Sequence, residues 1–212
     1  MSRLNLPILT KDPFTSTTST STQIPDLSLP ILTKRTTTSN DSAPLVSIIC
    51  TDETIQSSLL TQLLTEAYNK KPDAPRSLVV LSTDSKHAIQ NLTPDSATQH
   101  PVTPFISPFL GMTETDVAGF LARTCVGSAI STKVFYIADD QTPATGNLQM
   151  VFMYANNPLS RISFPMEWEY ANLLGVGVVR DPEITGEKVL SLIWKGVYKS
   201  NQPESPFWGD EL

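Results

Sequence analysis

Two adjacent carboxylates, Asp139 and Asp140, come directly after the apolar segment KVFYIA, and a third, Glu167, stands beside Trp168. Strand ends commonly carry ligand sites, because a rigid sheet aims side chains from the loop that follows it. Two carboxyl groups held close together can act as general acid and general base. Asp139, Asp140 and Glu167 are therefore the candidate catalytic residues. A simpler interpretation stays open, in which Asp139 caps a turn and Glu167 is solvated.

Arg161, Trp168 and Tyr170 are the candidates for a ligand or partner surface. Arg and aromatic residues are enriched at interaction hot spots, so Trp168 with Arg161 can floor a pocket or a partner surface. In the alternative, Trp168 and Tyr170 pack on the core. The most informative structural observation is whether Asp139, Arg161, Glu167 and Trp168 converge on one concave pocket.

Several other kinds of chemistry find no support in the residue pattern. Gly175-Val176-Gly177 lacks the third glycine of a dinucleotide-binding turn, and the sequence has no GK[ST] phosphate loop. His87 and His100 have no ligand partner at i+4. Cys50 and Cys125 stand among apolar residues, which is typical of buried, inert thiols in a reducing compartment. We therefore expect no cofactor, no metal site and no disulfide framework.

The charge pattern limits the classes of partner. The formal net charge is -6, and the basic residues are scattered through the sequence, so nucleic-acid binding is not expected. No apolar run approaches the ~20 residues needed to span a bilayer, and the first thirty residues lack the apolar core of a secretory signal. We expect a cytoplasmic protein without membrane association. Organelle targeting stays open, because the leader is rich in Ser and Thr and nearly free of acidic residues.

An eight-residue motif occurs twice near the N-terminus, as LNLPILTK at Leu4–Lys11 and as LSLPILTK at Leu27–Lys34. The Ser/Thr runs around it offer too little apolar burial to offset the entropy of ordering a backbone. Residues 1–43 are therefore predicted to be a disordered arm. The proline in each copy favours an extended segment, which can add to a sheet edge or fill a groove. The candidate docking residues are Leu6, Pro7, Ile8, Leu29, Pro30 and Ile31.

Three interpretations of the duplication remain. One copy pads an edge of the folded domain and the other has no role. Alternatively, two weak motifs dock on a protein partner and gain affinity from effective concentration, in cis or in trans. The third interpretation is a processed peptide precursor cleaved at Lys34-Arg35.

The segments after Pro44 predict alternating strands and helices. Apolar, β-branched residues indicate strands at LVSIIC and at Ser77–Ser82. The helical pattern between them, with Thr51 or Asp52 as its cap, predicts a right-handed parallel crossover. Residues 83–108 are predicted to be a long loop with one short strand near FISPFL.

The second half predicts a helix capped by Thr113 and Asp116, then a hairpin from KVFYIA and LQMVFMY, then a strand at SRISF. Residues 187–199 fit both a helix and a strand, and the charges at their ends favour a helix. Together these elements predict an α+β fold. We expect a single mixed-sheet domain at 44–200 with two to three helices, preceded by the arm and followed by a flexible tail at 201–212.

Five segments in this order resemble a family of uncharacterised domains found in fungi and bacteria. They are IICTDETIQ, MTETDVAGFL, FYIADDQT, LQMVFMY and RISFPMEWEYANLL, within Leu45–Asp181. In that family the strand ends are similar, although a basic residue precedes the first Thr-Asp and the Phe-Arg pair stands in a different order. The resemblance implies a domain boundary, no known activity and no catalytic residue.

The sequence thus favours a binding or accessory module, with the repeats as edge-strand or docking segments. One alternative is a small enzyme of fungal specialised metabolism that uses Asp139 or Asp140 with Glu167 as acid and base. A structural or assembly component is the other alternative. The sequence identifies neither a small-molecule ligand nor the protein partner.

Overall fold

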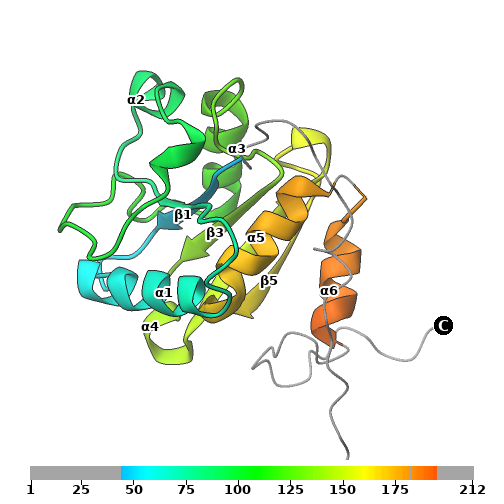
Figure 1. The fold of residues 1–212 in the computed structure, drawn as a ribbon. Coiled ribbons are helices and arrows are strands. Elements are labelled where there is room, and N and C mark those ends of the chain that lie inside the picture. Colours follow the sequence, from blue (N-terminus) through cyan, green and yellow to red (C-terminus); the bar gives the residue numbers. More distant parts are fainter. Residues whose placement is uncertain (1–43, 182, 195–212) are drawn as a thin grey trace, which may run out of the picture.

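The computed structural model describes residues 44–181 and 183–194, which Figure 1 shows as a sheet between helices. The predicted arm at 1–43 and tail at 201–212 lie outside these residues, as do both copies of the repeat. The sheet has the strand order β2-β1-β3-β4-β5. Its strands are β1 (Val46–Cys50), β2 (Leu78–Val80), β3 (Val134–Ala138), β4 (Asn147–Met153) and β5 (Arg161–Glu167).

The first three strands are parallel and the last two are antiparallel to their neighbours. The mixed sheet of an α+β fold is confirmed. The predicted parallel crossover from β1 to β2 and the hairpin from β3 to β4 are also present. The strand predicted at SRISF is β5.

Six α-helices lie in the described residues, more than the two to three predicted. They are α1 (Ser57–Asn69), α2 (Lys86–Gln90), α3 (Glu114–Thr124), α4 (Thr142–Thr145), α5 (Ala171–Arg180) and α6 (Gly186–Trp194). Short 3-10 segments add η2 (Pro94–Ser96), η3 (Tyr154–Asn156) and η4 (Trp168–Tyr170). Of the helices that were not predicted, α2 and α4 have five and four residues, and α2 with η2 corrects the loop predicted at 83–108. In α5, eight of ten residues are buried, so no alternation of apolar and polar faces marks it as a helix.

Side chains of alternate strand residues build a separate core on each face of the sheet. In β1, Ile48 packs into the core beneath α1, α5 and α6, whereas Ile49 packs into the core beneath α2 and α3. Figure 1 shows α1 and α5 side by side on one face and α3 on the other. Both faces are therefore covered, which explains why all five residues of β1 and of β3 are buried.

Of the two helix caps predicted from the sequence, the structure confirms one and contradicts the other. Thr113 and Asp116 form the predicted capping box of α3. The helix cap predicted at Thr51 or Asp52 is wrong, because α1 begins at Ser57. Gln56 precedes this helix, and its side chain makes no capping hydrogen bond within the described residues. Asp52 instead accepts hydrogen bonds from the backbone and hydroxyl of Thr54, which closes a turn after β1.

Two further segments settle open predictions. FISPFL is not a strand: residues 105–110 form a loop and a turn, and the Ser107 hydroxyl bonds to the Cys50 carbonyl at the end of β1. The segment from residue 187, which fitted both a helix and a strand, is helical as far as Trp194. Val189 of this helix packs into the core on the α1 and α5 face of the sheet.

Candidate functional site

The carboxyl ends of β1 and β3 lie at the point where the chain connections diverge. From β1 the chain passes through α1 to β2 on one side, and from β2 it returns to β3 on the other side. In open α/β sheets, ligands bind in the crevice at such a point. The backbone N–H of Thr51 donates to the carbonyl of Ala138 at 3.0 Å, which holds the two strand ends together.

Strand register aligns four polar residues across this edge. Cys50 pairs with Ala138 and Asn147 pairs with Glu167, so the continuation of the β1–β3 and β3–β4 registers adds Thr51 and Asp139 to the same line. We name Thr51, Asp139, Asn147 and Glu167 the carboxyl-edge row. Ile49 and Ile137, two residues before Thr51 and Asp139, pack toward α3, and two steps along a strand keep the same face. The row therefore faces the α3 side of the sheet.

Asp139 and Glu167, both predicted catalytic residues, thus lie on one edge and one face. Neighbouring strands are about 4.8 Å apart, so two strand spacings separate their backbones by roughly 10 Å. The Asp139 Oδ1 accepts bonds from the backbone of Gln141 at 3.0 Å and of Thr142 at 3.2 Å, and from the Thr142 hydroxyl at 3.2 Å. Asp139 therefore caps the turn into α4, as the simpler interpretation held. Asp140 is exposed beside it.

Asn147 lies in the row between these two carboxylates. Its side-chain Oδ1 is buried and has no hydrogen-bond donor among the described residues. A buried acceptor without a donor costs roughly 1–3 kcal/mol, so native proteins rarely keep one without a reason. Asn147 was not among the residues predicted from the sequence. The hairpin register that pairs it opposite Asp139 is the signal that would have found it.

A loop closes over the β1 end of the row. The Ser107 hydroxyl donates to the Cys50 carbonyl at 2.6 Å, and the Gly111 N–H donates to the Thr51 carbonyl at 2.9 Å. Phe109 between them is fully buried. These bonds hold the loop against the end of β1. Two of its apolar side chains, Ile106 and Leu110, remain 86% and 43% exposed.

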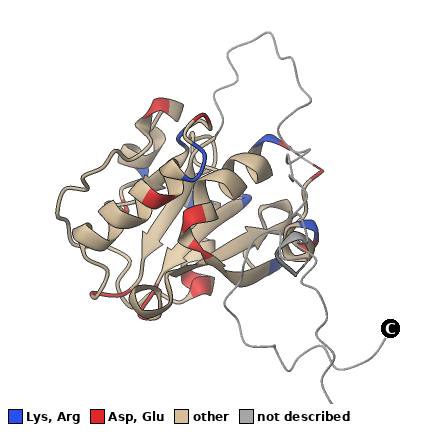
Figure 2. Ribbon diagram, turned by 60° about the horizontal axis from the view of Figure 1, so that its bottom comes forward, with Lys and Arg blue, Asp and Glu red and all other residues tan. Residues whose placement is uncertain are grey.

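The charge of this edge is negative. Asp52 and Glu53 follow β1, Asp139 and Asp140 follow β3, and Glu167 ends β5. The hydrogen bonds from Thr54 lower the pKa of Asp52, which keeps that carboxylate ionised. Figure 2, which brings the lower end of Figure 1 forward, shows several acidic positions near the centre of the view.

The structure places Arg161 away from this edge. Arg161 begins β5 and Glu167 ends it, so the length of the strand separates them. The Arg161 guanidinium forms an ion pair with Glu114 and donates to Thr115 Oγ1 at 2.8 Å. These contacts attach β5 to the start of α3.

Trp168 and Tyr170 lie in η4 against α1. The Trp168 indole donates to Glu66, and its ring belongs to the core. Lys70 binds Glu169 at 2.8 Å and lies 4.2 Å from the Tyr170 ring centroid. Asp139, Arg161, Glu167 and Trp168 therefore do not converge on one pocket. Trp168 follows Glu167 at the same edge, but its ring packs on the other face, so of these four only Asp139 and Glu167 share both an edge and a face.

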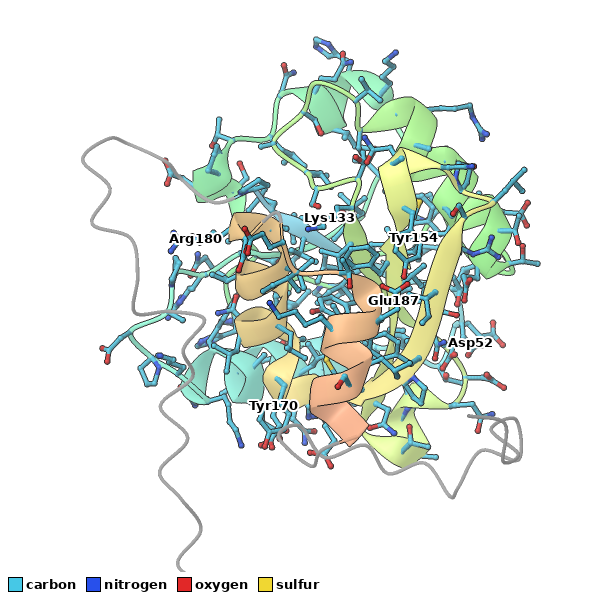
Figure 3. The ribbon with its side chains drawn as sticks, turned by 90° about the vertical axis from the view of Figure 1, so that its right-hand side faces the viewer. Asp52, Lys133, Tyr154, Tyr170, Arg180 and Glu187 are labelled. Atoms are coloured by element: carbon cyan, nitrogen blue, oxygen red, sulfur yellow. The ribbon has the colours of Figure 1, made fainter. Side chains whose placement is uncertain are left out.

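A second polar cluster, also missed from the sequence, attaches α6 to the sheet. The Tyr154 hydroxyl donates to Glu187 Oε1 at 2.5 Å, and Figure 3 shows the two side chains together. Burial, followed by the Glu187 carboxylate, raises the pKa of Tyr154 to about 12, and the Tyr154 hydroxyl lowers the pKa of Glu187. The Lys133 ammonium donates to the carbonyl of Val178, in the last turn of α5, and to that of Asp181, just after the helix. All of these bonds join elements of the fold to one another.

The two cysteines are free and buried. Burial raises the pKa of Cys50 to about 12 and of Cys125 to about 11. Since the thiolate is the nucleophile, neither is poised for attack at neutral pH. In residues 44–181 and 183–194, no group of three or more His, Cys, Asp or Glu side chains is arranged to hold a metal ion.

Comparisons with known proteins found no matching family model, no matching curated protein and no matching solved structure. The resemblance to uncharacterised fungal and bacterial domains therefore stays a prediction. None of the helices in the described part of the chain has the length and apolarity required to cross a membrane.

Proposed function

We propose that this domain is a binding module that takes a positively charged, hydrogen-bond-donating group at the carboxyl edge of its sheet. One observation carries the proposal: Asn147 Oδ1 is a buried acceptor without a donor in the described chain, and it lies in line with Asp139 and Glu167. Neighbouring atoms cover this oxygen, so a ligand that donates to it must first displace them, and it then removes the cost of leaving the oxygen unpaired.

The chemistry of the row selects the class of ligand. Ionised carboxylates and an amide oxygen only accept hydrogen bonds, so the bound group must donate. Bonds between a cationic donor and a carboxylate are roughly twice as strong as neutral ones, which favours a guanidinium or an ammonium. The exposed Ile106 and Leu110 add apolar contact beside the charged group.

Thermal unfolding with small cations tests the proposal. Agmatine carries both a guanidinium and an ammonium, whereas tetramethylammonium is a cation without an N–H donor. We expect millimolar agmatine to raise the melting temperature at constant ionic strength and tetramethylammonium to leave it unchanged. Asn147→Leu and Glu167→Gln should each abolish the agmatine response. Glu183→Gln, which alters an exposed carboxylate preceding α6, is the matched control and should retain it. Equal responses to both cations, or a response that survives in Asn147→Leu, would contradict the proposal.

A second candidate function is acid–base catalysis by Asp139 and Glu167. The observation in its favour is that the register places both carboxylates on one face of one edge. Such a pair suits general acid–base work when a substrate lies between the groups. Asp139→Asn and Glu167→Gln chains that fold normally should then lose a product from the metabolite profile of the host. An unchanged profile in both variants counts against catalysis.

A further inference from the structure

We propose that the carboxyl edge is occupied by a segment of the same chain, the second LPILTK motif at Leu29–Lys34. This inference rests on the proposed function and names the ligand of that edge. The segment lies outside the described residues, so its sequence and its distance along the chain carry the argument together with the surface that receives it.

The segment has the two properties that the edge requires. Its apolar residues Leu29, Ile31 and Leu32 are followed by the cations Lys34 and Arg35. The edge offers apolar side chains on the loop and carboxylates on the strand ends. Of the four large hydrophobic side chains exposed in the described residues, two lie on this loop, Ile106 and Leu110. The apolar and the cationic residues of the segment therefore match the two kinds of contact that the edge offers.

The outer edge of β2 is closed to an added strand. The Leu78 carbonyl accepts bonds from the Thr98 N–H at 2.8 Å and from the Tyr68 hydroxyl at 3.2 Å. The Val80 N–H donates to the Thr98 hydroxyl at 2.8 Å. The backbone groups that an incoming strand would use are already paired.

The outer edge of β5 also resists strand addition. The Trp168 N–H donates to Gly146 and the Tyr154 N–H donates to Ser160, so even-numbered residues of β5 pair with β4. Odd-numbered residues therefore direct their backbone groups outward, and Pro165 is one of them. A proline has no N–H to donate, and a proline on an edge strand is a common protection against pairing. The carboxyl edge is thus the better place for the segment to bind.

The chain is long enough for this arrangement. Thr51 lies seven residues beyond Pro44, which places the row about 23 Å along β1 from its entry at ~3.3 Å per residue. The nine residues from Arg35 to Pro44 span at most about 30 Å. The cations of the second motif can therefore reach the row. The first motif is separated by a much longer tether, which lowers its effective concentration, and it lacks an arginine after its lysine.

Amide hydrogen exchange on the full-length chain tests the inference. A short tether gives an effective concentration on the order of 1 mM, so a segment with a Kd of about 0.1 mM would be bound about nine-tenths of the time. We expect Leu29→Ser combined with Ile31→Ser and Lys34→Ser to speed exchange about tenfold in residues 105–112 and 139–147. A synthetic peptide of residues 26–36 should restore the slow exchange, and a scrambled peptide should not. The matched control carries Leu6→Ser, Ile8→Ser and Lys11→Ser.

Each outcome separates this inference from the proposed function. Unchanged exchange in the second-motif variant, or a loss of protection only in the first-motif control, overturns the inference. If agmatine still slows exchange at the edge in such a case, the carboxyl edge remains a binding surface with a different occupant. If agmatine has no effect either, both proposals are wrong.

Discussion

In a chain that carries Leu29→Ser, Ile31→Ser and Lys34→Ser, so that the second motif leaves the carboxyl edge empty, replacement of Asn147 by leucine should raise stability. The wild-type chain buries Asn147 Oδ1 without a donor among the described residues, at a cost of roughly 1–3 kcal/mol. Leucine branches at the same carbon and removes that unpaired acceptor, although its two methyl groups are larger than the amide oxygen and nitrogen. We expect the free energy of unfolding to rise by about 1–2 kcal/mol. With a urea m-value of about 1–3 kcal/mol/M, the midpoint should move upward by roughly 0.3–2 M.

A matched variant separates the effect of removing the unpaired oxygen from the effect of strand propensity. Leucine also suits a strand better than an amide side chain does, so Asn147→Leu would gain stability from that source alone. Gln149 lies two residues further along β4, on the same face and also half-buried, and none of its atoms is both buried and unpaired. Gln149→Leu should therefore change stability by less than about 0.5 kcal/mol. Equal gains in the two variants, or a loss in Asn147→Leu, would refute the reasoning about the unpaired oxygen.

Three more predictions concern the contacts that hold the fold. Asn172→Leu should cost about 2–4 kcal/mol in urea unfolding, because the buried N–H and hydroxyl of Ser77 both donate to Asn172 Oδ1; a cost below about 0.5 kcal/mol would contradict this. Gly186→Ala should cost about 1–3 kcal/mol, since the added methyl would lie 3.1 Å from the Tyr154 hydroxyl and clash with β5; an unchanged melting temperature would show that α6 shifts freely. Tyr154→Phe should flatten the loss of stability above pH 10. Because the pKa of Tyr154 is raised from 10.0 to about 12, its contribution is complete below pH 10 and disappears as pH rises toward 12; identical alkaline unfolding curves would exclude it.

Local signals in the sequence were sufficient for many elements. β1 and β3 are runs of buried apolar residues, and the Thr113–Asp116 box depends only on residues three apart, so both could be predicted. The long segment at 83–108 could not be predicted in detail. Its path is determined by contacts such as Ser107 with Cys50, which lie 57 residues apart.

The candidate functional residues also divide into those with a local signal in the sequence and those whose contacts depend on distant residues. The sequence identified Asp139 and Glu167 as carboxylates next to strand ends. It could not decide that Arg161 would pair with Glu114, or that the Trp168 indole would bond to Glu66. These partners lie 47 and 102 residues away in the chain.

The amino-acid sequence by itself determined where apolar strands and capped helices form, because periodicity and capping act over a few neighbouring residues. Only the tertiary structure decided that Thr51, Asp139, Asn147 and Glu167 share one row and one face of the sheet. Strand order and register depend on which distant segments bury their apolar faces against one another. Side chains from four separate strands become neighbours only when those choices are made together.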